Sequence, residues 1–202
     1  MLRKLYYRIA ALFFRFQVKS LGKESRLRLK GRIIGGQYVR LGDGVEMEKD
    51  FIIAVYPEFG GQKNPVSTSP DGGVWIGSGG SYNRKLTVYC AERVEIGKDV
   101  LFGSDILISD NEHGTNPESP VPYRDQPLKT APVLIGDRCW VCEGAKILSG
   151  TRIGKESIIA AGAVVKGVFP ERCILAGVPA RIIRVWNDEK KAWDKPTRKD
   201  SF

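Results

Sequence analysis

An aliphatic β-branched residue recurs at every sixth position through residues 133–165, and a small residue follows it four positions later. The aliphatic positions are Ile135, Val141, Ile147, Ile153, Ile159 and Val165, and the small ones are Cys139, Ala145, Thr151, Ser157 and Ala163. A helix repeats its apolar face every three to four residues and a strand every two, so neither explains a period of six. If six residues form a short strand and its corner, three units close a triangular turn, and successive turns stack through parallel hydrogen bonds. We therefore predict a stacked coil with the aliphatic residues inside, the small ones beside the corners, and Gly136 and Gly154 relieving tight corners.

The same frame extends toward the N-terminus and is broken twice. Two less regular inward sets precede the first break: Leu29, Gly35, Leu41, Met47 and Ile53, and Leu27, Ile33, Val39, Val45 and Phe51. The frame returns at Ile76, Ile96, Phe102 and Ile108. Residues 57–73 contain three prolines and four glycines, and residues 109–132 contain five prolines, so neither segment can continue a buried strand. We expect both to leave the coil, and such long excursions usually carry function.

Composition and charge indicate one main domain with appendages. A chain of 202 residues, 42% of them hydrophobic, can bury one substantial core, and no break in composition requires a second. The net charge of +9 is concentrated at residues 1–30, which hold nine Lys and Arg residues against the single acid Glu24. Charge without a groove-reading motif does not predict a nucleic-acid partner.

The four cysteines, Cys90, Cys139, Cys142 and Cys173, are expected to be reduced thiols, because no cleavable signal peptide precedes them. A cytoplasmic location follows. Cys139 and Cys142 have the spacing of a redox or zinc pair, but they fall on an inward position and a corner of the repeat, which favours a structural role. With His113 as the one histidine, no metal site is expected.

Both termini are expected to form helices. An apolar arc at helical spacing adjoins a basic stripe; the arc is Leu2, Leu5, Ile9, Leu12, Phe13 and Phe16, and the stripe is Lys4, Arg8, Arg15 and Lys19. This helix either caps the open end of the coil or lies on an anionic membrane surface, and the two uses are compatible. At the other end, a short helix would place Trp186 and Trp193 on one face. The expected organisation is a basic helix over 1–25, the coil over 26–183 and a charged tail or helix over 184–202.

Three stretches carry a family resemblance: Ile-Gly-Asp-Arg-Cys-Trp-Val at 135–141, the hexads up to Val165, and Ala-Gly-Val-Pro-Ala-Arg-Ile at 176–182. From about residue 90 to 184 the chain resembles the hexapeptide-repeat acyltransferases, especially the maltose and galactoside acetyltransferases and the O-acetyltransferases of bacterial surface polysaccharides. The resemblance implies an all-β fold, a left-handed parallel β-helix, to which the two terminal helices would be added. It also implies a homotrimer that binds acetyl-coenzyme A between neighbouring subunits.

In that family a histidine on a loop leaving the coil acts as general base, and the segment Asp110-Asn-Glu-His113 resembles the family's motif. An imidazole with a pKa near 6.5 suits this task, because it can accept the proton of a sugar hydroxyl that attacks a thioester. Asp110 or Glu112 is the candidate to orient the imidazole, and the sequence leaves that choice open.

The resemblance also assigns residues to the coenzyme. Trp140 corresponds to a tryptophan beside the acceptor and pantetheine cleft, or else packs between subunits. The remaining positions are Glu143, Ala161, Gly162, Val165, Lys166, Arg181 and Arg184. The three cations among them suit the phosphates, whereas Glu143 and Val165 depart from the family's usual residues.

The sequence thus predicts direct transfer of an acetyl group from acetyl-coenzyme A to a sugar hydroxyl of a small-molecule or oligosaccharide acceptor, in surface polysaccharide biosynthesis. N-acetylation of a nucleotide-linked amino sugar is the alternative. A third is a non-catalytic scaffold that keeps the coil. A γ-type carbonic anhydrase on the same kind of coil is excluded, because one histidine cannot supply its zinc site. Peripheral contact with the inner membrane face through the N-terminal helix remains open.

Overall fold

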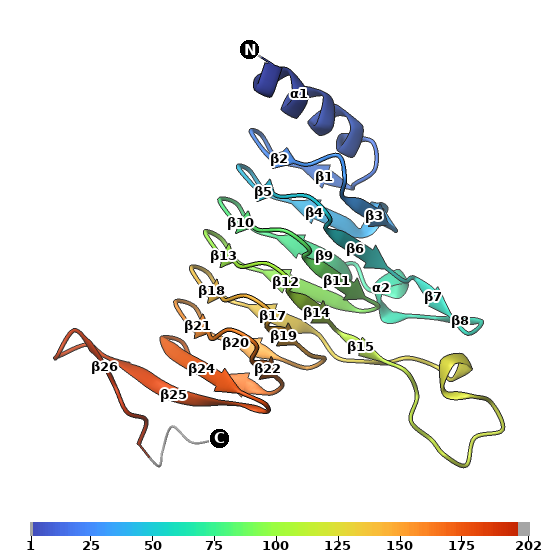
Figure 1. Ribbon diagram of the computed structural model, residues 1–202. Helices are drawn as coiled ribbons and strands as arrows, with labels where there is room; N and C mark the ends of the chain where they lie inside the picture. Colours follow the sequence, from blue (N-terminus) through green and yellow to red (C-terminus); the bar gives the residue numbers. More distant parts are fainter. Residues whose placement is uncertain (1, 198–202) are drawn as a thin grey trace.

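Short parallel strands stack into three faces of a prism (Figure 1). The computed structural model describes residues 2–197, without the side chains of residues 2–4 and 8. Face A contains, in stacking order, β1 (Ser20–Leu21), β4 (Val39–Leu41), β9 (Gly73–Ile76), β12 (Arg93–Ile96), β17 (Val133–Ile135), β20 (Arg152–Ile153) and β23 (Val168–Phe169). Face B contains β2 (Arg26–Leu27), β5 (Glu46–Met47), β10 (Ser81–Tyr82), β13 (Leu101–Phe102), β18 (Trp140–Val141), β21 (Ile158–Ile159), β24 (Cys173–Gly177), β25 (Ala180–Asn187) and β26 (Ala192–Asp194). Face C contains β3 (Arg32–Ile34), β6 (Ile52–Val55), β11 (Thr87–Cys90), β14 (Leu107–Ser109), β19 (Lys146–Ile147) and β22 (Val164–Val165).

The hexads form the most regular part of this coil. Leu134 pairs with Arg152 and Trp140 with Ile158, so one full turn here takes three hexads. In the earlier turns a full circuit is two residues longer, since Val74 pairs with Val94. All six aliphatic positions of the hexads and all five small positions are buried. The stacked coil predicted from the period of six is confirmed.

The small positions satisfy backbone groups at the corners. The thiol of Cys139 donates to the carbonyl oxygen of Gly154 at 3.2 Å. The hydroxyl of Thr151 donates to the carbonyl oxygen of Leu148 at 2.6 Å. The corner glycines are required by close approach: a Cβ on Gly154 would lie 2.2 Å from the backbone nitrogen of Glu171 in the next turn. These contacts explain why the corners accept only small residues or polar ones that can hydrogen-bond.

The two predicted interruptions do leave the coil, and both contain local structure. The first holds the antiparallel hairpin of β7 (Glu58–Phe59) and β8 (Gln62–Lys63), followed by the one-turn helix α2 (Pro65–Thr68). The second departs and returns through an antiparallel pair, β15 (Asn111–Glu112) and β16 (Lys129–Thr130). We refer to residues 57–73 as the first excursion and to residues 109–132 as the second excursion.

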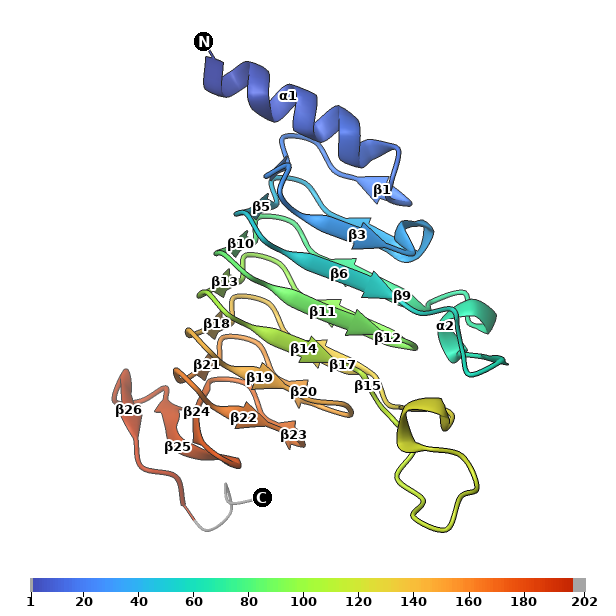
Figure 2. The same cartoon turned by 45° about the vertical axis from the view of Figure 1, so that its right-hand side comes forward.

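Helix α1 (Leu2–Arg15) crosses the N-terminal end of the prism (Figures 1 and 2). Ala10 and Phe14 are fully buried, and the ring of Phe14 packs 5.6 Å from that of Phe51 inside the first turns. The helix therefore caps the coil, but not through the predicted apolar arc, whose described members Leu5, Ile9, Leu12, Phe13 and Phe16 are exposed. Leu2, Lys4 and Arg8 of the predicted surfaces lie outside the described side chains. Neither helix in residues 2–197 has the length and apolar character needed to cross a bilayer.

The predicted C-terminal helix is wrong, because residues 180–194 form a β-hairpin. Strand β25 pairs antiparallel with β24 and then with β26. The turn is set by Asn187, whose side-chain oxygen accepts the backbone N–H groups of Glu189 and Lys190 at 3.0 and 2.9 Å. Trp186 and Trp193 do meet, as a directly opposed cross-strand pair with ring centroids 5.3 Å apart.

Candidate active site

The two excursions project from the same side of the coil and touch each other (Figures 1 and 2). The ring of Phe59 on β7 meets that of His113 edge-on, with centroids 5.2 Å apart. A Cβ on Gly60 would lie 3.3 Å from the carbonyl oxygen of Asp125, so the excursions also approach each other through their backbones. His113 is exposed just beyond β15. The histidine of this chain thus lies where two irregular segments meet.

Asp110 is fully buried at the base of the second excursion. Its Oδ1 accepts the backbone N–H of Ala91 at 2.7 Å, and its Oδ2 accepts that of Glu92 at 2.9 Å. The side-chain amide of Asn111 also donates to Oδ1, at 2.8 Å. These donors occupy the carboxylate, so Asp110 does not have the predicted contact with the imidazole. It fixes the point at which the chain leaves the coil.

Glu112 has a different partner from the one predicted. Its Oε1 accepts from Nζ of Lys166 at 2.8 Å, which ties the second excursion to the corner after β22. Both side chains are largely exposed, so the pair contributes at most about 1 kcal/mol. The pair brings together Glu112, which was predicted to act in catalysis, and Lys166, which was predicted to bind phosphate.

Gln126, which sequence reasoning missed, holds the second excursion in shape. It is buried, and its side-chain nitrogen donates to the carbonyl oxygens of Asn116 at 2.9 Å and Val121 at 3.2 Å. Its side-chain oxygen accepts the N–H of Asn116 at 3.1 Å. Gly114 makes room for it, since a Cβ there would lie 2.6 Å from that of Gln126. Phe59 was also missed, and only the glycine and proline content of its segment marked it as irregular.

Several residues predicted to bind the coenzyme gather at the corner between faces B and C. The N–H of Gly162 donates to the carbonyl oxygen of Glu143 at 2.8 Å, so Glu143 and the Ala161–Gly162 corner stack in consecutive turns. Gly162 has φ of +68° and open space where a Cβ would point. Trp140 precedes this corner on the outer surface of face B and is 47% exposed, beside Leu101 and Ile158. Ala161 and Gly162, which we call the ledge, are exposed at this corner and follow the strand that pairs with the exposed Trp140.

The remaining predicted coenzyme residues lie elsewhere or point inward. The side chain of Val165 is fully buried in the core, so it does not face the outer surface on which a coenzyme would lie. Lys166 follows β22 and Gly162 precedes it by two residues, so the two are at most about 13 Å apart at the rise of a strand. Arg181 and Arg184 are exposed on β25 and form no ion pair within the described part of the chain. Within a single copy of the chain, the ledge at Gly162 and the second excursion therefore lie at opposite ends of β22.

The cysteines have the structural character that was predicted. All four are free, and Cys90, Cys139 and Cys173 are buried. Burial raises the pKa of the Cys139 thiol to about 11 and also raises that of the half-buried Cys142. Neither thiol has the lowered pKa of a redox or nucleophilic cysteine. Within the described residues, no three His, Cys, Asp or Glu side chains are grouped to hold a metal ion.

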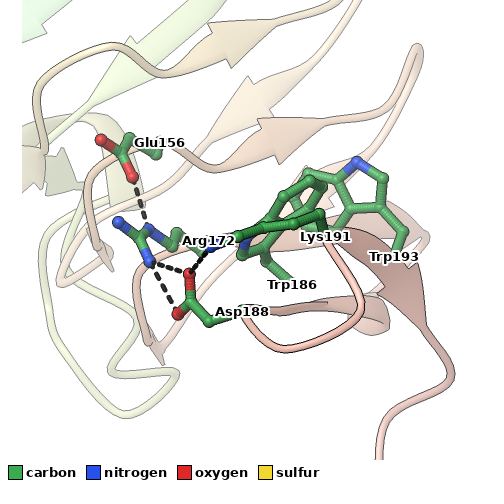
Figure 3. A pocket seen from close by; sticks show the side chains of 6 residues that line it. All are labelled: Glu156, Arg172, Trp186, Asp188, Lys191 and Trp193. Carbon is green, nitrogen blue, oxygen red and sulfur yellow. Dashed lines mark hydrogen bonds and ion pairs between the residues drawn. The ribbon is translucent and has the colours of Figure 1, made fainter.

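A hollow at the C-terminal hairpin contains none of the predicted site residues. It has a volume of about 360 Å³ and is lined by Glu156, Arg172, Trp186, Asp188, Lys191 and Trp193 (Figure 3). Arg172 bridges Glu156 at 2.5 Å and Asp188 at 2.9 Å. Hydrogen bonds from Arg138 and Arg172 lower the pKa of Glu156 to about 2. This ion-pair network joins the hairpin to the last hexads.

Comparison with known proteins identifies the repeat. Residues 132–167 match the family model described as bacterial transferase hexapeptide (six repeats). This segment is a hexapeptide repeat. Among solved structures, a galactoside acetyltransferase in complex with coenzyme A superimposes with a TM-score of 0.62 at 20% identity, over 92% of this chain and 74% of that one. The Bacillus cereus N-acyltransferase AntD, bound to an amino-sugar nucleotide and coenzyme A, gives a TM-score of 0.66 at 15% identity, over 89% and 90%. The expected left-handed parallel β-helix is confirmed.

Curated relatives of the hexapeptide-repeat chain carry acetyltransferase names. A lipopolysaccharide biosynthesis O-acetyl transferase of Escherichia coli, WbbJ, described as putative, is 37% identical over 56% of this chain and 61% of its own length. The galactoside O-acetyltransferase of E. coli is 32% identical over 63% of this chain and 61% of its own length. The chain thus spans about three fifths of these relatives. The resemblance to hexapeptide-repeat acyltransferases drawn from the sequence is confirmed.

Proposed function

We propose that this protein transfers an acetyl group from acetyl-coenzyme A to a hydroxyl group of a sugar. The observation that carries the proposal is the placement of His113: an exposed imidazole on a firmly anchored excursion beside a hexapeptide-repeat coil. The relatives named as O-acetyl transferases of lipopolysaccharide and of galactosides support the reaction class.

His113 is assigned the role of general base. Its imidazole accepts the proton of the acceptor hydroxyl as the hydroxyl oxygen attacks the thioester carbonyl, and a backbone N–H near the cleft stabilises the oxyanion. Coenzyme A leaves as the thiolate, and no acyl-enzyme is needed. Phe59 limits the movement of the imidazole through its edge contact. Asp110 is a positioning residue, which acts by fixing the backbone from which His113 extends.

The acetyl-coenzyme A site is assigned to a cleft between copies of this chain. The ledge at Ala161–Gly162 and the exposed Trp140 suit the pantetheine arm, while Arg181 and Arg184, which have no ion pair among residues 2–197, suit the phosphates. Lys166 is already paired with Glu112, so it would have to exchange partners to bind phosphate. Because the ledge and the second excursion are separated within one chain, a homotrimer is the assembly in which one copy's excursion completes the next copy's ledge.

The acceptor class and the location are inferred from one relative and from the cysteines. The relative named for lipopolysaccharide biosynthesis favours a sugar of a surface polysaccharide as acceptor. Four free cysteines, three of them buried, suit a reducing cytoplasm. N-acetylation of an amino sugar remains the alternative, because the same base and the same thioester would serve an amine.

The test incubates the protein with acetyl-coenzyme A and a panel of oligosaccharides and sugar nucleotides, while free thiol and product mass are followed. Thiol release that depends on an acceptor, with a product one acetyl group heavier, is expected. Hydroxylamine or mild alkali removes an O-acetyl ester but leaves an amide, so product lability decides between oxygen and nitrogen. Absence of both transfer and calorimetric coenzyme A binding would overturn the proposal in favour of a non-catalytic scaffold.

A further inference from the structure

Helix α1 has two apolar faces, and the coil uses only one of them. Ala10 and Phe14 point into the prism and are buried. On the opposite face, Leu5, Ile9 and Leu12 follow one another at helical spacing and remain exposed, with Phe13 beside them and Phe16 continuing the spacing just after the last residue of the helix. Leu12 is 59% exposed and Phe16 is 83% exposed. We call these five residues the outer stripe. Capping of the coil does not explain them, because they face away from it.

The charges around the outer stripe select one kind of partner. No acidic residue occurs before Glu24, and Arg15, Lys19 and Lys30 are exposed without an ion pair among the described residues. Lys30 lies next to the helix, because the N–H of the adjacent Leu29 donates to the hydroxyl of Tyr6 at 2.9 Å. An exposed apolar stripe with neighbouring cations, on a helix without acidic residues, is the pattern of a helix that lies in the interface of an anionic bilayer.

The position of the helix makes such docking geometrically simple. Helix α1 lies across the end of the prism (Figures 1 and 2), and the five residues of the outer stripe are exposed there. The excursions that carry Phe59 and His113 leave the side of the coil after β6 and β14, the second and fourth strands of face C counted from the helix. Burial of the stripe in lipid headgroups would therefore leave the candidate active site open.

We propose that the outer stripe of helix α1 docks this protein on a membrane surface that contains anionic lipids. Large apolar side chains enter the headgroup region, and Arg15, Lys19 and Lys30 face lipid phosphates. The inference rests on the helix alone and holds whether or not acetyl transfer is the activity.

The test uses the full chain and sucrose-loaded vesicles, either of phosphatidylcholine alone or of phosphatidylcholine with phosphatidylglycerol. Co-sedimentation with the anionic vesicles is expected, weaker on the neutral ones and reduced by salt. The double variant Leu12→Glu, Phe16→Glu changes only exposed side chains and should weaken binding about tenfold or more. Arg15→Gln should weaken it about fivefold, the effect of one cation near an anionic surface. Circular dichroism checks that the variants stay folded.

Val168→Glu is the matched control. Val168 is 64% exposed on β23, at the opposite end of face A from the helix, and its replacement should leave vesicle binding unchanged. Wild-type protein that stays in the supernatant, or a double variant that binds like wild type, overturns the proposal. A change of mass by light scattering in the double variant, without vesicle binding by the wild type, assigns the stripe instead to a second copy of the chain. Acetyl transfer to a water-soluble acceptor, assayed on the same variants, reports on the proposed function separately.

Discussion

The hexad coil and the second excursion are neighbours in the chain, yet they are held together in opposite ways. In the coil, a position in the repeat determines where a side chain lies: Ile147 is buried and the preceding Lys146 is exposed, and in every hexad strand the inward residue is buried and the residue before it is not. In the second excursion no position repeats, and single residues such as Asp110 and Gln126 fix the backbone. Under the proposed function, the repeat supplies the stability and the segment that interrupts the repeat supplies the chemistry.

The largest effect on stability is expected inside the coil. Ile147→Ala should lower the free energy of unfolding by about 2–5 kcal/mol, because it opens a cavity between stacked turns. Denaturant unfolding followed by circular dichroism measures it. Lys146→Ala, on the same strand but facing outward, should change stability by less than about 0.5 kcal/mol. Equal effects of the two variants would mean that the inward positions do not carry the fold.

A smaller and more local effect is expected at the base of the second excursion. Asp110→Ala leaves the backbone N–H groups of Ala91 and Glu92 without an acceptor, at a cost of about 1–3 kcal/mol. The excursion should then open, and trypsin should cleave after Arg124 or Lys129 sooner than in the wild type. Mass spectrometry of timed digests gives the rates. Glu118→Gln, at an exposed position of the same segment, serves as the control. Unchanged cleavage in Asp110→Ala would show that this carboxylate does not anchor the excursion.

Acid should release the C-terminal hairpin before it affects the coil. The folded-state pKa of Glu156, about 2, lies below its ordinary value of 4.5, so its stabilising contribution is present above pH 4.5 and is lost as the pH falls toward 2. Tryptophan fluorescence of the Trp186–Trp193 pair should change in that window while the circular dichroism of the coil persists. Glu156→Gln should show the change already at neutral pH. Glu171→Gln, which loses one exposed pair with Lys155, should not. A wild-type signal that is flat down to pH 2 would contradict the assignment.

The smallest effect distinguishes inward from outward thiols within the hexads. Alkylation of the native protein should modify Cys142 first, because Cys139 is buried and its pKa is raised to about 11. Peptide mapping after a short treatment with iodoacetamide measures the order. Preferential labelling of Cys139 would show that Cys139, and not Cys142, is the accessible thiol of this turn. It would also support a reactive role for the pair.

The regular parts of this fold could be predicted from the sequence because their information is local. A period of six specifies a strand, a corner and an inward side chain wherever it occurs, and it located Ile135 and Val141 in the core. The C-terminal hairpin could not be predicted in that way, because its turn depends on the Asn187 side chain and its strand on pairing with β24. Likewise, the spacing of α1 identified an amphipathic helix but not which face the coil would take, since the residue inserted is Phe14.

The candidate site was predictable only in part for the same reason. His113 was singled out by its position in an irregular segment, and the structure places it exposed at the junction of both excursions. Its neighbour Phe59 comes from a segment more than fifty residues away, and no local pattern joins the two. Asp110 and Glu112 were credible partners for the imidazole by proximity in sequence. In the fold, the Asp110 carboxylate accepts two backbone N–H groups, and the Glu112 carboxylate accepts from Lys166.

The central claim is that His113, and not a residue of the coil, is the general base of the transfer. The kinetics of His113→Gln test this claim most directly. Transfer from acetyl-coenzyme A to the best acceptor should fall in kcat by about 10²–10⁴-fold, the usual contribution of a general base. The melting temperature and the affinity for coenzyme A should stay at the wild-type values, because His113 is exposed and its deletion opens no cavity. A kcat within about threefold of the wild type, in a variant that melts like the wild type, would contradict the account.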